Sequence, residues 1–138
     1  MYLKKRKFIE EKIKSTDDVL NKYSEIELDM LSETLIEDEY PVKDFLKAEV
    51  LTEDNSTIDG RLLITNKSIM FYYQTDLLFD YVKIPFEDIV LVAEGFDYSN
   101  RESGMLTIYT EELGYFFIGL MRFGLFRWID YISKNIQN

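Results

Sequence analysis

The spacing of apolar residues changes at Pro41, and this change constrains the fold of the 138-residue chain more than any other feature. Between Phe8 and Ile36 the apolar side chains recur at helical intervals. The pair Tyr40-Pro41 ends this pattern, because the residue before a proline is driven out of the α region. Downstream, short β-branched and aromatic runs alternate with turn residues, which predicts an antiparallel sheet rather than βαβ units.

Seven runs after Pro41 have the length and composition of strands. Asn66-Lys67 has the composition of a tight hairpin turn, and Pro85 ends a run because proline cannot donate to a sheet ladder. The predicted strands are 45–51, 61–65, 68–74, 79–84, 89–94, 105–110 and 115–118.

Helical spacing occurs at both ends of the chain. The segment Ser15-Thr16-Asp17-Asp18 offers side chains suited to an N-cap, which predicts a break there and a second helix from about Asp17 to Ile36. Beyond Gly119 the period is helical again. The predicted terminal helix has one apolar face, formed by Leu125, Ile129, Ile132 and Ile136 and flanked by Phe126 and Trp128.

These elements together predict a mainly β fold with added helices. We expect a seven-stranded, partly open barrel capped by the C-terminal helix, which covers otherwise unpaired strand edges. A helical extension over 1–41 precedes a domain over 42–138. We expect no export signal, because Glu10, Glu11 and Lys12 interrupt the stretch where an apolar region would be required.

The chain contains neither His nor Cys, which removes most catalytic chemistry. Ser-His-Asp and Cys-His systems, thiolate chemistry and the usual zinc sites are excluded. Adjacent carboxylates such as Glu37-Asp38-Glu39 and Glu111-Glu112 are expected to be solvated, because Asp and Glu are rarely buried without a partner. We therefore predict a protein that is not an enzyme and holds no cofactor or metal.

Charge is unevenly distributed along a chain whose net charge is −10. Residues 15–54 carry thirteen acids and three Lys. Such a field repels polyanions, so we expect no nucleic-acid partner. Residues 1–14 instead carry six Lys and Arg against two Glu, and the basic arm is a candidate contact with an anionic membrane surface. The arm consists of Lys4, Lys5, Arg6 and Lys7. The favoured alternative is that this segment forms a solvated helix, or a helix that pairs with the acidic stretch.

Apolar residues cluster between Phe116 and Phe126. If side chains alternate, about half of them face the core, and Met121 and Phe123 are expected to protrude. Core packing is the favoured interpretation of this run, and a protein-docking surface formed by the protruding side chains is the alternative. The candidate partner-binding residues are Met121, Phe123, Phe126 and Tyr98.

The segment Gly60 to Tyr72, GRLLITNKSIMFY, resembles the glycine-started strand, Thr-Asn-Lys hairpin and next strand of GRAM and related bacterial pleckstrin-homology-like domains. Ile84-Pro85-Phe86-Glu87-Asp88-Ile89 resembles the Ile-Pro-Leu-x-x-Ile segment that follows in that family. The Trp128-Ile129 helix takes the family's usual C-terminal place, so the resemblance covers about residues 43–138. It implies a bent seven-stranded barrel capped by one helix, which binds lipid or protein without catalysis.

One departure from the family pattern matters for lipid binding. Relatives that bind phosphoinositides carry Lys and Arg in the loop after the first strand, because phosphate recognition needs donors and positive charge. Here that loop, 53–59, reads EDNSTID, and Arg61 is the only nearby cation. We do not expect head-group binding there.

The resemblance and the charge pattern lead to one expected function and two alternatives. We expect a module for protein–protein interaction in the bacterial cytoplasm or at the inner membrane surface. The bacterial assignment rests on the resemblance, and a reducing cytoplasm agrees with the absence of Cys. The alternatives are an acidic inhibitor or immunity-type protein that binds a basic partner through 17–54, and a peripheral lipid-binding module that uses the basic arm. The partner and the oligomeric state stay open.

Overall fold

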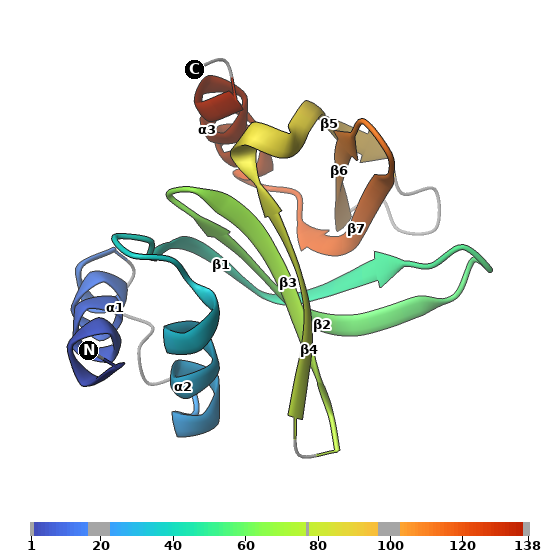
Figure 1. Cartoon of the computed structure of the whole chain (residues 1–138). Helices are drawn as coiled ribbons and strands as arrows, with labels where there is room; N and C mark the ends of the chain where they lie inside the picture. The colour runs from blue at the N-terminus through green and yellow to red at the C-terminus, as the bar shows by residue number, and fades with distance from the viewer. Residues whose placement is uncertain (1, 17–22, 77, 97–102, 137–138) are drawn as a thin grey trace.

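A seven-stranded antiparallel sheet forms the centre of the molecule in a computed structural model (Figure 1). The structure describes residues 2–16, 23–76, 78–96 and 103–136. The sheet has the order β4-β3-β2-β1-β7-β6-β5. Its strands are β1 (Pro41–Leu51), β2 (Thr57–Thr65), β3 (Ser68–Thr75), β4 (Leu78–Pro85), β5 (Ile89–Phe96), β6 (Ser103–Thr110) and β7 (Gly114–Met121).

Three α-helices and one short 3-10 helix accompany the sheet within the described residues. Helices α1 (Tyr2–Thr16) and α2 (Glu25–Thr34) precede it, and η2 (Phe86–Asp88) connects β4 to β5. Helix α3 (Leu125–Ile136) ends the described chain and packs against β5 and η2. The strands β4 and β5 are the two edges of the sheet, so the barrel is open between them. The predicted fold of seven strands, a capping helix and an N-terminal helical extension is confirmed.

All seven predicted strands are present, and each of them is longer than predicted. In β2 the apolar pattern marks only the buried part of the strand. Residues 57–60 are exposed or half-buried, whereas Arg61–Thr65 are buried. Hairpin ends that extend into solvent lack the apolar alternation that identified the strands.

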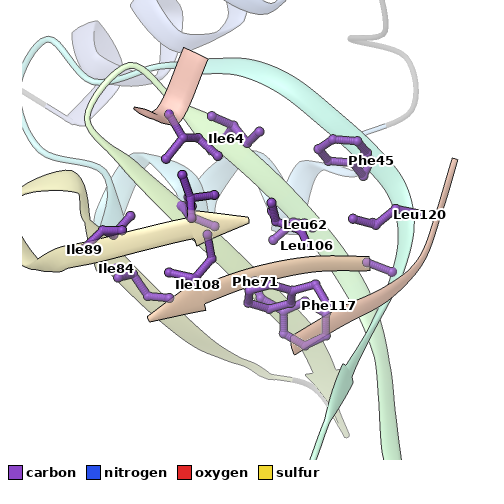
Figure 2. Close-up of a cluster of buried hydrophobic side chains, with 14 of the residues drawn as sticks. Phe45, Leu62, Ile64, Phe71, Ile84, Ile89, Leu106, Ile108, Phe117 and Leu120 are labelled. Atoms are coloured by element: carbon purple, nitrogen blue, oxygen red, sulfur yellow. The ribbon is translucent and has the colours of Figure 1, made fainter. Parts of the chain in front are cut away.

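The larger core fills the concave side of the sheet (Figure 2). Phe71 of β3 and Phe117 of β7 face each other across it, with ring centroids 5.7 Å apart. Helix α3 closes one end of the core by burying Leu125 and Ile132. The strands supply the rest of the core, which includes Phe45, Leu62, Ile64, Ile84, Ile89, Leu106, Ile108 and Leu120.

A second core lies on the opposite face of β2 and β3, beneath α1 and α2 (Figure 1). Leu63 and Met70 point into it, while their sequence neighbours Leu62 and Ile69 point into the larger core. These strands are therefore buried on both faces, which explains their continuous apolar runs. The two helices and the residues that flank α2 contribute Ile9, Ile13, Tyr23, Leu28, Leu31 and Leu35.

Helix α2 begins later than the sequence analysis predicted. Its N-cap is Ser24, whose hydroxyl accepts from the Glu27 amide at 3.1 Å while the Glu27 carboxylate accepts from the Ser24 amide at 3.0 Å. This capping box satisfies two amides that the first helical turn leaves unpaired. The prediction of one helix from about Asp17 to Ile36 is therefore wrong at Ser24, which is extended, and the predicted start near Asp17 lies outside the described residues.

Candidate docking groove

A groove of about 590 Å³ separates the first half of β1 from the corner between β7 and α3. One wall is formed by residues 43–47 of β1. The other wall is formed by Gly119, Met121, Phe123, Gly124, Arg127 and Trp128. We call this feature the β1/α3 groove. Its volume lies within the range of sites that hold small ligands or short peptide segments.

The β1/α3 groove opens where β1 and β7 part. The two strands pair only at Glu49–Ile118 and Val50–Phe117. Just before this point, β1 shifts register against β2 between Phe45 and Ala48. Just after it, β7 carries Gly119 in a left-handed conformation, with φ at 75°. Two strand irregularities thus flank the point of separation, and bulges of this kind bend a strand away from its neighbour.

A tight turn holds Phe123 in solvent at the rim of the groove. The amide of Leu125 donates to the carbonyl oxygen of Arg122 at 3.2 Å, which closes a four-residue turn. Gly124, the third residue of that turn, has a φ of 82°, as a type II turn requires. Leu125 is buried beside it, so the turn is anchored and Phe123 is left 92% exposed.

The predicted partner-binding residues are only partly brought together. Met121 is 72% exposed and lines the β1/α3 groove with Phe123. Phe126 is 76% exposed but does not belong to the groove lining. Tyr98 lies outside the described residues. Leu46 was not among the predicted site residues; it is 41% exposed on the opposite wall, in the irregular part of β1.

Three cations line the same groove. The Lys43 ammonium lies 5.2 Å from the centroid of the Phe45 ring, and the Arg127 guanidinium lies 5.4 Å from that of Trp128. Lys47 is exposed on β1. The groove therefore combines apolar surface with positive charge, and aromatic faces help to hold two of the cations in place.

The basic arm is divided between internal and exposed positions. Arg6 donates to Glu25, to Asp29 at 2.6 Å and to Glu10 at 3.2 Å. The hydrogen bond with Glu25, followed by that with Glu10, raises the pKa of Arg6. Ile9 and Ile13 on the same helix are buried against the sheet. Lys4 and Lys7 are exposed, and Lys5 is half-exposed.

The acidic stretch supplies internal partners as well as surface. Glu39 is 1% exposed and accepts hydrogen bonds from Thr65, Ser68 and Lys83, each at 2.5 Å. Burial acts to raise its pKa, but these donors and the Ile36 amide outweigh burial and lower it. The expectation that Glu37-Asp38-Glu39 is solvated is therefore wrong for Glu39. Its charge is paired with that of Lys83, which is far away in the sequence.

The loop between β1 and β2 lacks the features of a phosphate site. Its hydroxyls are turned inward: Thr52 and Ser56 both donate to the Asp54 carboxylate, at 2.5 Å and 2.6 Å. The hydrogen bond from Ser56, followed by that from Thr52, lowers the pKa of Asp54 to about 2. The nearby cation Arg61 pairs with Asp44 and Glu27. The donors that an anion would need are thus engaged within the protein.

Among the described residues, no group of three or more acidic side chains has the geometry to hold a metal ion. No described helix is both long enough and apolar enough to cross a bilayer.

Comparison with known proteins identifies solved structures that have a similar fold. No family model matches the sequence, and no curated protein matches it. Among solved structures, the N-terminal PH domain of Vps36 matches with a TM-score of 0.57 and 14% identity, over 75% of this chain and 83% of that one. A Vav1 structure with an allosteric inhibitor matches with a TM-score of 0.54 and 15% identity, over 71% of this chain but only 27% of the Vav1 chain.

A third match is a protein with a pleckstrin-homology domain from Shewanella loihica, with a TM-score of 0.51 and 11% identity over 76% of this chain and 86% of that one. Similarity at these identities concerns the fold and not the ligand. Together with the strand order and the position of α3, these matches show that the chain has a pleckstrin-homology-like fold.

Proposed function

We propose that this protein is a non-enzymatic binding module that docks another protein at the β1/α3 groove. The observation that carries the proposal is the exposure of Phe123, 92%, at the rim of a groove that Met121 also lines. Exposing an aromatic ring to water forgoes the free energy of burying it, about 1.5–3 kcal/mol. A partner that covers Phe123 recovers this free energy, and aromatic anchors of this kind dominate many protein interfaces.

The resemblance of the segment Gly60 to Tyr72 to GRAM domains supports a binding role, since pleckstrin-homology-like folds serve as recognition scaffolds. We place the module, on the same resemblance, in a bacterial cytoplasm or at the inner membrane surface. The domain over 42–138 carries the groove, and the extension over 1–41 covers the other face of the sheet.

Membrane binding by the basic arm is less well supported than protein docking. A membrane-surface helix needs an apolar face to insert, and α1 uses Ile9 and Ile13 inside the second core. Arg6 is committed to Glu25 and Asp29. The exposed cations of α1, which are Lys4, Lys7 and Lys14, supply only electrostatic attraction of about 1 kcal/mol each near an anionic surface.

An acidic inhibitor role is also less well supported. It requires the carboxylates of 17–54 to be presented to a basic partner. Three of them, Glu27, Glu39 and Asp44, are instead paired with Arg61 or Lys83 inside the protein. The negative surface that this stretch offers is correspondingly smaller than its composition suggests.

Affinity purification with matched variants tests the proposal. The tagged protein and its Phe123→Asp and Ile26→Asp variants are used as baits in the source cells, and bound proteins are quantified by mass spectrometry. Ile26 is a suitable control because it is an exposed apolar residue, 54% exposed, in the first turn of α2, where an acidic residue is favourable.

The proposal predicts a protein that binds the parent and Ile26→Asp baits equally and is lost with Phe123→Asp. Retention of every bound protein by Phe123→Asp would contradict it. Sedimentation with anionic vesicles is measured separately. Salt-sensitive binding to the vesicles that Lys4→Glu and Lys7→Glu abolish would favour the membrane alternative over protein docking.

A further inference from the structure

The charge of the β1/α3 groove is opposite to that of the protein. The chain carries a net charge of −10. The charged residues that line the groove are Lys43, Lys47, Arg127 and Asp44. Asp44 pairs with Arg61, whose Nη2 donates to its Oδ2 at 2.5 Å and which also pairs with Glu27. The lining of the groove therefore carries three cations against one carboxylate, which is itself paired inside the protein.

We propose that the occupant of the groove is an extended acidic segment of a partner protein, with a large apolar side chain packed against Leu46, Met121 and Phe123. This inference rests on the proposed function and adds the chemistry of the partner to it. Carboxylates of the segment lie against Lys43, Lys47 and Arg127, which provide charge-assisted hydrogen bonds. The apolar side chain covers the exposed surface that the groove offers between these cations.

The strand arrangement favours an extended segment over a helix. On the side of β1 away from β2, the strand β7 pairs with residues 49 and 50 alone. The preceding stretch, 43–47, is the part of β1 that lines the groove. A strand edge of this kind can align another extended chain through its backbone, and side chains of the added chain then enter pockets at alternate positions.

The cations are placed to discriminate between segments rather than to attract them from afar. A net charge of −10 repels acidic partners at long range, but at physiological salt this repulsion is screened beyond about 8 Å. Within that distance the local charges of the groove determine which segments bind. A basic segment in the same position would meet three like charges, and like-charge contacts at interfaces suppress wrong partners.

Two matched libraries of short synthetic peptides test this inference directly. In one library, large apolar residues alternate with Asp or Glu; in the other, the same apolar residues alternate with Lys. Affinities for the full chain are measured by fluorescence anisotropy, with the parent and with the Lys47→Glu/Arg127→Glu and Phe123→Asp variants. Lys134→Glu is the charge-reversal control, because Lys134 is exposed near the far end of α3.

We expect binders from the acidic library and none of comparable affinity from the Lys library. Lys47→Glu/Arg127→Glu is expected to weaken the best acidic peptides by about tenfold or more, whereas Lys134→Glu changes their affinity by less than about twofold. Equal binding of both libraries, absence of binding by either, or affinities unchanged by Lys47→Glu/Arg127→Glu would each overturn the inference.

The two proposals fail in different ways. If the double charge reversal has no effect while Phe123→Asp still abolishes capture of a protein in cells, the docking groove stands and its acidic specificity falls. If acidic peptides bind but Phe123→Asp leaves their affinity unchanged, they occupy a different surface, and the inference about this groove falls as well.

Discussion

Arg61 of β2 and Asp44 of β1 form a buried ion pair in which the guanidinium Nε lies 3.0 Å from both carboxylate oxygens. The same guanidinium donates through Nη1 to Glu27 of α2 at 2.8 Å. Tyr72 of β3 donates its hydroxyl to that Glu27 oxygen, and the Tyr23 ring centroid lies 3.9 Å from the Arg61 Cζ. One cation of the sheet thus holds the N-terminal extension in place.

This network has consequences for ionisation. Burial and the nearby Asp44 carboxylate raise the pKa of Tyr23, and burial likewise raises that of Tyr72. For Glu27, burial acts to raise the pKa, but hydrogen bonds from Ser24 and Tyr72 and the charge of Arg61 outweigh burial and lower it. Glu27 and Arg61 are therefore charged at neutral pH, while both phenols are neutral.

Replacing Arg61 by Ala is predicted to lower the free energy of unfolding by about 3–5 kcal/mol, because Asp44 and Glu27 are left partly buried without their cation. Urea denaturation followed by circular dichroism measures the change. The control is Arg127→Ala, which alters an exposed side chain and is expected to change stability by less than about 0.5 kcal/mol. A similar small change for Arg61→Ala would mean that the ion pair contributes little.

Removal of residues 1–41 is predicted to destabilise the remaining chain and to make it aggregate. The truncation uncovers Leu63, Met70 and Tyr72, each no more than 2% exposed in the full chain. Large exposed apolar patches are aggregation hazards. Light scattering and binding of the dye ANS, compared with the full chain, report the result. A monomeric fragment 42–138 with unchanged melting temperature would show that the extension is dispensable for the fold.

Stability is predicted to fall in acid through Glu39. Its folded-state pKa lies below the ordinary value of 4.5, so the unfolded chain binds the proton more tightly. The stabilisation is complete above the unfolded-state pKa and is lost as the pH falls through the folded-state pKa. Denaturation series below about pH 5 measure this loss.

The variant Glu39→Gln is expected to be less stable at neutral pH and to show a weaker dependence on pH in this acidic range. Glu37→Gln provides the matched control, because Glu37 is exposed two residues away. A dependence in Glu39→Gln as steep as in the parent would assign the acid sensitivity to other carboxylates, such as Glu27.

Ser24→Ala is predicted to cost about 1 kcal/mol, because it removes the side chain that accepts from the Glu27 amide. Ser24→Gly is the informative comparison, since glycine at an N-cap costs only a few tenths of a kcal/mol. Thermal denaturation of both variants measures the difference. Equal losses of stability in the two variants would show that Ser24 does not act through helix capping.

Local patterns were sufficient to predict the elements of the sheet. The hairpin of β2 and β3 was predictable because apolar runs flank Asn66-Lys67. In the structure, the side chain of Asn66 also accepts from the Tyr40 amide at 2.8 Å. The start of α2 was missed although Ser24 and Glu27 have capping-box spacing, because Asp17-Asp18 offered a competing cap. Two nearby cap signals cannot be ranked without tertiary contacts.

The apolar run in β2 carries a sequence signal for the packing of the extension. The consecutive apolar residues Leu62, Leu63 and Ile64 break the alternation of a strand with one wet face. That pattern indicates burial on both faces and therefore a cover such as α1 and α2. The partners of Glu39 and Arg61, by contrast, come from elements far apart in the chain, and residue spacing alone does not specify such pairs.

The β1/α3 groove was only half predictable. Alternation indicated that Met121 and Phe123 protrude, and the turn at Gly124 explains why Phe123 does so. The opposite wall depends on the register shift between Phe45 and Ala48, which follows from how β1 pairs with β2. Register depends on the whole sheet, so Leu46 and Lys47 could not be assigned to a site from their sequence.

Site-specific photocrosslinking in the source cells tests the docking groove most directly. A photoreactive phenylalanine analogue is placed at position 123, and in a matched control at position 126, whose side chain is also exposed but lies outside the groove lining. We predict a discrete protein adduct from position 123 that is reduced when Lys47→Glu/Arg127→Glu is introduced. Lipid adducts alone, or no protein adduct at position 123, would contradict protein docking at this groove.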